Sequence, residues 1–158
     1  MQPVTTLLQH RPGAPGLQLG LGPAWRRVGA LRQLQALFDG HSHWAQKRSR
    51  RQLRSMLRGS QAAVSAWEGD RLVGFGRASS DGVFRAVLWD VVVAEPQQGK
   101  GLGRRIVAEL LHCPQVSRVE RVYLMTTNSA GFYRRLGFEN SHRQHLLIWH
   151  PATEQVRS

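Results

Sequence analysis

A glycine-rich turn between a valine-rich strand and an apolar helix is the part of the sequence best suited to bind a ligand. The strand contains Val91, Val92 and Val93, and the turn then reads Gln98-Gly99-Lys100-Gly101-Leu102-Gly103-Arg104. Glycine has no Cβ, so a ligand can approach the main chain within hydrogen-bonding distance. Helical spacing of apolar residues begins at Leu102, which places the unpaired N–H groups of a helix N-terminus beside the turn. These features predict an anion site, and a diphosphate fits it best.

Two better-known nucleotide loops are disfavoured by the glycine spacing. A Walker A loop has four residues between its glycines and ends in Gly-Lys-Ser or Gly-Lys-Thr, an ending that is absent here. A dinucleotide fingerprint has the spacing G-x-G-x-x-G near the first strand–helix–strand unit of a chain. Here the spacing is G-x-G-x-G, and three predicted strands precede it.

The remaining sequence predicts a short series of helices and strands. Apolar spacing indicates a helix from Leu31 to Phe38 that ends at Asp39-Gly40, and a helix from Arg50 to Arg58 that ends at Gly59. The further expected elements are strands 62–67, 72–78 and 84–93, helix 101–111, strand 119–126, helix 129–136 and strand 146–149. The turns that join the first three strands make those strands antiparallel, whereas a helical crossover makes its two strands parallel. The sheet is therefore mixed.

Composition limits the class of protein. The chain has 158 residues, 41% of them hydrophobic, which fits one packed domain. No apolar run of 18 residues suggests a membrane span. The single Cys113 excludes an internal disulfide and favours a reducing compartment, so we expect a cytoplasmic protein. The histidines show no spacing typical of metal ligands, so no metal is expected.

Positive charge dominates the chain and suggests an anionic partner. Its formal net charge is +12, and six basic residues lie between Lys47 and Arg58. Such a field attracts nucleotides or nucleic acid, but a solvated helix face is the default explanation of the run, and nucleic-acid contact is the alternative. The first 38 residues contain no acid, and Gly and Pro are frequent between Pro12 and Pro23. We therefore expect a flexible extension over residues 1–22, with a short strand near Leu17–Leu21, and a single domain over residues 23–158.

Two motifs together resemble one enzyme family. Gln98, Gly101 and Gly103 form the pattern Gln-x-x-Gly-x-Gly, which resembles the coenzyme A signature of the GNAT N-acetyltransferase superfamily. Downstream, the segment from Asn128 to Glu139 resembles that family's second motif, in which a tyrosine precedes Leu-Gly-Phe. Within the superfamily, the sequence around Trp89 is similar to cyanobacterial and chloroplast acetyltransferases, a group that includes serotonin N-acetyltransferases and protein-lysine acetyltransferases. The likeness covers about residues 60 to 150.

The resemblance implies a fold and a cosubstrate. The GNAT fold is an α/β (α+β) fold with a mixed sheet of about six or seven strands and about four helices. Acetyl-CoA is the implied cosubstrate. The implied coenzyme-binding residues are the segment from Gln98 to Arg104, the strand residues Val91, Val92 and Val93, Asn128 and Tyr133. Family members often carry an asparagine seven residues before the tyrosine, where this chain has Thr126, so Asn128 is displaced from the usual position.

Two residues are candidates for proton transfer, one from the resemblance and one from its place in the sequence. Tyr133 matches the family's usual proton donor to the leaving thiolate. Asp90 is the acid best placed by sequence to take a proton from the attacking amine, provided that its pKa is raised by an apolar strand. The alternative for Asp90 is a structural acid. Strict alternation would turn Trp89 and Asp90 to opposite faces of the sheet, unless the bulge typical of this strand in GNAT folds intervenes.

The expected activity is transfer of an acetyl group to a primary amine, either a small arylalkylamine such as serotonin or a protein lysine. The acetyl group would move by direct attack in a ternary complex. The alternative is a basic nucleic-acid-binding module without acetyltransferase activity, based on the Lys47–Arg58 run. Dimers are common in this superfamily, so a homodimer is one open alternative.

Overall fold

The computed structural model of the chain describes residues 3–10 and 29–151 and forms two compact units, residues 1–125 and residues 126–158. In the first unit the elements are β1 (Thr5–His10), α1 (Ala30–His41), α2 (Arg50–Arg58), β2 (Ala62–Glu68), β3 (Arg71–Ser80), β4 (Arg85–Val93), the 3₁₀ turn η1 (Glu95–Gln97), α3 (Leu102–His112), α4 (Pro114–Ser117) and β5 (Arg121–Leu124). The second unit contains α5 (Ala130–Arg135).

One mixed sheet organises the first unit. Its order is β1-β2-β3-β4-β5, with three antiparallel pairings and one parallel pairing, between β4 and β5. β4 and β5 are parallel because α3 and α4 carry the chain back between them. The predicted α/β fold class and mixed sheet are therefore confirmed, although the described residues form five strands instead of six or seven.

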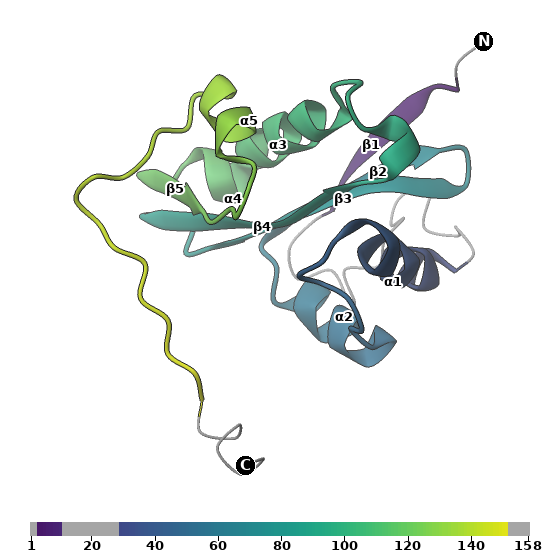
Figure 1. Cartoon of the computed structure of the whole chain (residues 1–158), viewed down its shortest axis with the longest axis horizontal. Coiled ribbons are helices and arrows are strands. Elements are labelled where there is room, and N and C mark those ends of the chain that lie inside the picture. The colour runs from purple at the N-terminus through teal and green to yellow at the C-terminus, as the bar shows by residue number, and fades with distance from the viewer. Residues whose placement is uncertain (1–2, 11–28, 152–158) are drawn as a thin grey trace. The chain divides into compact units, whose positions relative to one another are not determined.

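Helices cover both faces of the sheet (Figure 1). A Cβ at Gly74 would lie 2.7 Å from Ile106 Cδ1, and one at Gly76 would lie 2.9 Å from a methyl carbon of Leu110, so these glycines let α3 pack closely. Phe75 lies between them and points to the other face, where its ring meets Phe38 of α1 edge to face at 5.7 Å. The core therefore lies on both faces of the sheet, and β4 lies between the central strand β3 and the edge strand β5.

The helix and strand ends follow the predictions closely in the middle of the chain. α2 begins and ends as predicted: Ser49 and Gln52 form a capping box at its start, with bonds of 3.1 and 2.8 Å, and Gly59 is its C-cap. α1 differs, since it continues through Asp39 and Gly40 to His41. Local stop signals are weak against packing, and Phe38 in this last turn is fully buried.

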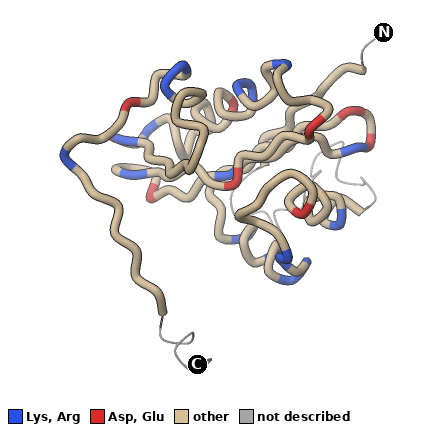
Figure 2. Tube along the Cα trace, in the orientation of Figure 1, with Lys and Arg blue, Asp and Glu red and all other residues tan. Residues whose placement is uncertain are grey.

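Lys and Arg residues, blue in Figure 2, are prominent on α2.

The two ends of the chain depart most from the predictions. Residues 5–10, which we expected in a flexible extension, form β1 and pair with β2 along their whole length. The strand expected near Leu17–Leu21 lies outside the described residues. The strand expected at Leu146–Trp149 is not formed, and these side chains are 65 to 88% exposed. Four consecutive apolar residues set no inward face, so this pattern was a weak predictor of pairing.

No helix in the described part of the chain is both long enough and apolar enough to cross a membrane.

Candidate functional site

A bulge interrupts the pairing of β4 with β3. Phe75 pairs with Val92 and Arg77 pairs with Trp89, so two steps along β3 correspond to three along β4. Asp90 lies within the bulge and has a φ of 55°. This is a left-handed conformation, which aspartate adopts more readily than most residues. As a result Trp89 and Asp90 share one face, where both contact Arg77. The bulge predicted for this strand is confirmed.

Asp90 is held by three side chains. Its Oδ2 lies 2.8 Å from Arg77 Nε and 3.2 Å from Arg48 Nη1, and Trp44 Nε1 donates to its Oδ1 at 3.2 Å. The Asp90 side chain is only 5% exposed. Burial favours the neutral acid, but the hydrogen bonds and positive charges of Arg48 and Arg77 outweigh it and hold the pKa of Asp90 below its ordinary value. Asp90 is therefore an ionised carboxylate in a closed network.

The raised pKa that we expected for Asp90 is therefore wrong. An isolated strand carboxylate would have shown it, but two guanidinium groups stabilise the charged form. Two of the partners, Trp44 and Arg48, come from the segment between α1 and α2, which has no periodic pattern to reveal them. Arg77 was accessible to sequence reasoning, because the turn before β4 sets the register that pairs Arg77 with Trp89.

Replacement of Asp90 by Asn should lower the free energy of unfolding by about 2 kcal/mol at pH 7, because two partly buried arginines lose their counter-charge. A lowered folded-state pKa stabilises the fold above the unfolded-state pKa, near 4, and this stability disappears as pH falls through the folded value. Urea unfolding of both proteins at pH 7 and pH 2.5 should show the gap shrinking at acid pH. An equal gap at both values would mean that the charge of Asp90 contributes nothing.

The edge of β4 that faces β5 is open beyond the bulge. Parallel pairing runs from Arg85 with Arg121 to Leu88 with Leu124, and β5 then ends. β4 itself continues to Val93. On this side, residues 89–93 have no partner strand among the described residues. In a strand, alternate residues turn their N–H and C=O groups to each edge, so this stretch can accept an extended ligand as an added strand.

The glycine turn that follows presents a row of amides. Gly99 and Gly101 have φ values of 76° and 83°, and Gly101 is the N-cap of α3 without a side-chain cap. A Cβ at either glycine would meet no heavy atom of the described structure within 4 Å, so the turn is open on that side. Among the hydrogen bonds between described residues, none is donated by a backbone N–H of residues 99–104. These six amides therefore have no hydrogen-bond acceptor among the described residues, and the N–H groups at a helix N-terminus carry partial positive charge.

Two hydrogen bonds fix the turn against the sheet. Gln98 Nε2 donates to the Val93 carbonyl at 2.9 Å, which ties the turn to the end of β4. The N–H of Glu95 donates to His41 Nδ1 at 3.1 Å, which ties η1 to the end of α1. The turn therefore has a defined position beside the open strand edge.

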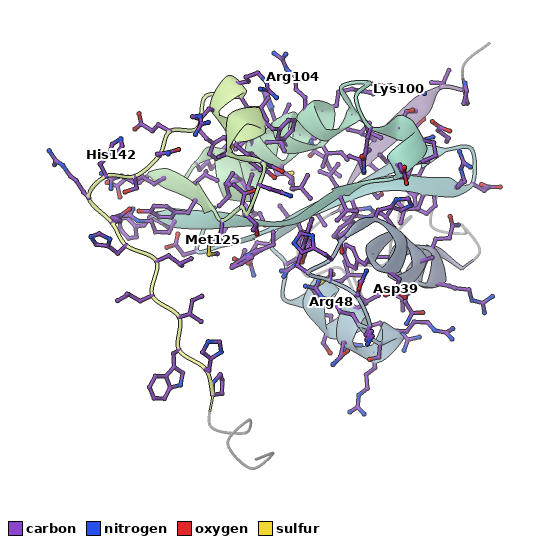
Figure 3. All side chains as sticks on the ribbon, in the orientation of Figure 1. Asp39, Arg48, Lys100, Arg104, Met125 and His142 are labelled. Atoms are coloured by element: carbon purple, nitrogen blue, oxygen red, sulfur yellow. The ribbon has the colours of Figure 1, made fainter. Side chains whose placement is uncertain are left out.

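Positive charge surrounds the turn. A cavity of about 440 Å³ lies beside the start of α3, and its lining includes Arg71, Lys100 and Arg105 along with the single acid Glu68. In Figure 3, Lys100 and Arg104 lie on the side of the sheet that carries α3, whereas Arg48 lies on the opposite side with α2. The site in this unit therefore combines free amides, basic side chains and an unpaired strand edge.

The other predicted residues belong to the second unit. Tyr133, on α5, packs edge to face between the rings of Phe132 and Phe138, at 5.0 and 5.7 Å. Burial raises the pKa of Tyr133, so the phenol stays protonated at neutral pH. Asn128 accepts a hydrogen bond from Ser129 Oγ at 3.3 Å just before the helix. Tyr133 is therefore a weak acid held in an aromatic cluster.

A model of the acetyltransferase (GNAT) family matches residues 25–138. The chain belongs to the GNAT family. It is therefore an acyltransferase, as its sequence motifs predicted.

Similar proteins place the chain within the GNAT family. It is 32% identical over 127 residues to a Porphyra purpurea protein named uncharacterized N-acetyltransferase ycf52. The matched region covers 77% of this chain and 72% of the Porphyra protein. It is 46% identical over 69 residues to serotonin N-acetyltransferase 2, chloroplastic, of Oryza sativa subsp. japonica, covering 43% and 34% of the two chains. These relatives confirm the resemblance to the cyanobacterial and chloroplast group.

Solved structures confirm the GNAT fold. The GNAT family protein SP0256 of Streptococcus pneumoniae TIGR4 superposes with a TM-score of 0.70 at 22% identity, covering 94% of this chain and 98% of that one. The described residues of this GNAT chain contain no group of three or more His, Cys, Asp or Glu side chains suited to hold a metal ion.

Proposed function

We propose that the chain transfers the acetyl group of acetyl-CoA to a primary amine by direct attack within a ternary complex. The observation that carries this proposal is the row of unbonded amides at residues 99–104 beside the unpaired edge of β4. Had these amides been engaged within the protein, no group would be left to hold a diphosphate. Their freedom, together with the family membership, supports coenzyme A as the ligand.

The residues fit the chemical parts of coenzyme A. The amides from Gly99 to Arg104 would donate hydrogen bonds to the diphosphate, and Lys100 and Arg104 would add charge at the same place. The backbone of Val91, Val92 and Val93 would pair with the amide-containing pantetheine arm as an added strand. An N–H from this stretch would also polarise the thioester carbonyl. Acetyl-CoA supplies an activated acyl group in this arrangement.

The attacking amine must lose a proton, and Asp90 is poorly suited to take it. A lysine-type amine has a pKa of about 10.4, so a base or water must deprotonate it. Asp90 has a lowered pKa and already binds two arginines. We therefore assign Asp90 as a positioning residue, which holds the bulge and the Trp44–Arg48 segment on the acceptor side. The proton of the amine passes to water.

Tyr133 is the proposed donor of a proton to the leaving thiolate. A thiol of the cysteine type has a pKa near 8.5, so protonation at its sulfur favours departure. The raised pKa of Tyr133 supports this role, because the phenol remains protonated across the range in which amines are acetylated. Asn128, five residues earlier, is proposed to contact the pantetheine.

A thiol-release assay tests the activity. The protein is incubated with acetyl-CoA, a panel of amines and a thiol-reactive dye, and we expect amine-dependent release of free coenzyme A. The background is low because Cys113 is buried and its thiol pKa is raised to about 11, chiefly by burial. Absence of thiol release with every amine, together with tight and salt-sensitive binding of DNA, would instead favour a nucleic-acid-binding module.

The names of two relatives suggest the class of acceptor. The rice relative is named for serotonin, and a Glycine max relative that is 38% identical over 73 residues is named histone acetyltransferase TAP1. We propose an arylalkylamine or a lysine side chain as the acceptor. A homodimer and a cytoplasmic location stay predictions, and two of the relatives are named as chloroplastic.

A further inference from the structure

A strip of arginines on α2 has no function in the site described so far. Leu53 and Leu57 are buried, so the helix keeps its apolar face inward, against α1. The opposite surface carries exposed positive charge, and no acid occurs from residue 40 to residue 67. The exposed basic residues of this strip are Lys47, Arg50, Arg51, Arg54 and Arg58. We call these five residues the α2 strip.

The strip lacks counter-charges within the described structure. None of the ion pairs or side-chain hydrogen bonds between described residues involves the guanidinium groups of its four arginines. Arg50 and Arg54 are four residues apart, as are Arg54 and Arg58, so like charges repel along the helix. This repulsion weakens the helix, and an anionic partner lying along it would relieve the repulsion.

The strip begins beside the acceptor side of the reaction centre. Arg48 contacts Asp90 at the β4 bulge, and Arg50 starts α2 two residues later. A helix rises 1.5 Å per residue, so Arg58 lies about 12 Å along α2 from Arg50, and Arg48 precedes the helix. An extended peptide covers about 3.3 Å per residue, so α2 spans about four residues of a bound segment, and the approach from Arg48 adds about one more. Trp44, which donates a hydrogen bond to Asp90, is half-exposed and lies near the start of α2.

We propose that the α2 strip recognises acidic residues within about five positions of the acceptor lysine in a protein substrate. This inference rests on the proposed acetyltransferase function and names its substrate class. The α2 strip would bind Asp and Glu side chains of an extended segment while the lysine amine reaches the open edge of β4. Nucleic acid is less favoured, because no aromatic residue is interleaved with the arginines on this nine-residue helix to stack on bases.

Two matched peptides provide the test. Each has blocked ends and a single lysine; one carries Asp and Glu at the flanking positions, and the other carries Asn and Gln. At low salt we expect kcat/KM for the acidic peptide to exceed that of the neutral one by about tenfold, and the ratio to fall towards one in about 0.5 M salt. Serotonin serves as a small acceptor that is too short to reach the strip.

Charge-neutral variants locate the effect. The triple variant Arg51→Gln, Arg54→Gln, Arg58→Gln should lose most of the preference for the acidic peptide and keep its activity on serotonin within twofold. These side chains are exposed, and glutamine is a good helix former, so the fold is retained. The control variant Arg32→Gln, Arg118→Gln, Arg121→Gln removes the same charge from exposed positions outside α2 and should keep the preference.

The outcomes separate this inference from the proposed function. Equal kcat/KM for the two peptides, a preference that survives the triple variant, or acetylation of serotonin alone would overturn the inference and leave the acetyltransferase function standing. DNA that binds the strip more tightly than the acidic peptide at physiological salt would also overturn it. Absence of both coenzyme A binding and acetylation of any acceptor would overturn the proposed function and this inference with it.

Discussion

Gly101→Val raises the Kd for coenzyme A by at least about 100-fold, because valine cannot keep the turn that aims the amides. Gly101 has a φ of 83°, which is strained for a β-branched residue. Its Cβ would meet no protein atom within 4 Å, so the side chain would instead occupy the space that the diphosphate needs. Loss of two charge-assisted hydrogen bonds, at about 1.5 kcal/mol each, accounts for this factor. Isothermal titration calorimetry measures it.

Gly69→Val is the matched control for this variant. Gly69, in the β2–β3 hairpin, also has a positive φ, 58°, and also has open space at its Cβ position. The control therefore carries the same kind of backbone strain at a place away from the glycine turn. We expect both variants to lower the melting temperature, but only Gly101→Val to lose coenzyme A. Wild-type affinity in Gly101→Val would show that the turn does not hold the diphosphate.

Tyr133→Phe should lower kcat by about 100-fold while the Kd for acetyl-CoA changes less than threefold, because the proposed role of the phenol is to protonate the leaving thiolate and not to bind the coenzyme. The ring is retained, so its packing against Phe132 and Phe138 persists. Steady-state kinetics with a thiol-reactive dye and calorimetry measure the two quantities. Since burial raises the pKa of Tyr133, its loss should also leave the acid limb of the pH profile unchanged.

The only other tyrosine of the chain supplies the control. Tyr123 lies on β5, and the substitution Tyr123→Phe also removes one phenol hydroxyl. That variant should keep kcat within about threefold of wild type, an expectation for a position outside the chemistry. If the two variants had equal activity, Tyr133 would have no place in the mechanism.

Sequence reasoning recovered the elements whose cause is local. The boundaries of α2 follow from its apolar spacing and from Gly59, which is its C-cap. The β2–β3 hairpin follows from its turn at Gly69-Asp70, and the start of α3 follows from glycines in the turn before Leu102. In each case a few adjacent residues decide the backbone conformation, so the pattern is visible without knowledge of the fold.

Features decided by distant residues could not be predicted in the same way. β1 becomes a strand because β2 offers it a partner more than fifty residues away, and its own sequence alternates poorly. The ionised state of Asp90 depends on Arg48 and Arg77, which come from different elements. The run Leu146–Trp149 had strand-forming residues but has no strand partner among the described residues. Local composition does not predict which distant segment will pair with a strand or an ionised side chain.

The freedom of the amides at residues 99–104 was predicted in principle, but only the structure gives it as a fact about hydrogen bonds. The glycines implied close approach of a ligand to the main chain, and a Cβ at Gly99 or Gly101 would meet no heavy atom of the described structure within 4 Å. The open edge of β4 beyond Leu88 was not visible from the sequence, because it arises where β5 ends early.

Titration of ¹⁵N-labelled protein with coenzyme A, followed through backbone amide chemical shifts, tests the central claim most directly. We expect the largest shifts at the amides of residues 99–104 and at Val91, Val92 and Val93, because these groups would gain hydrogen bonds to the diphosphate and the pantetheine. Saturating coenzyme A that leaves the peaks of Gly99, Gly101 and Gly103 in place would contradict the account.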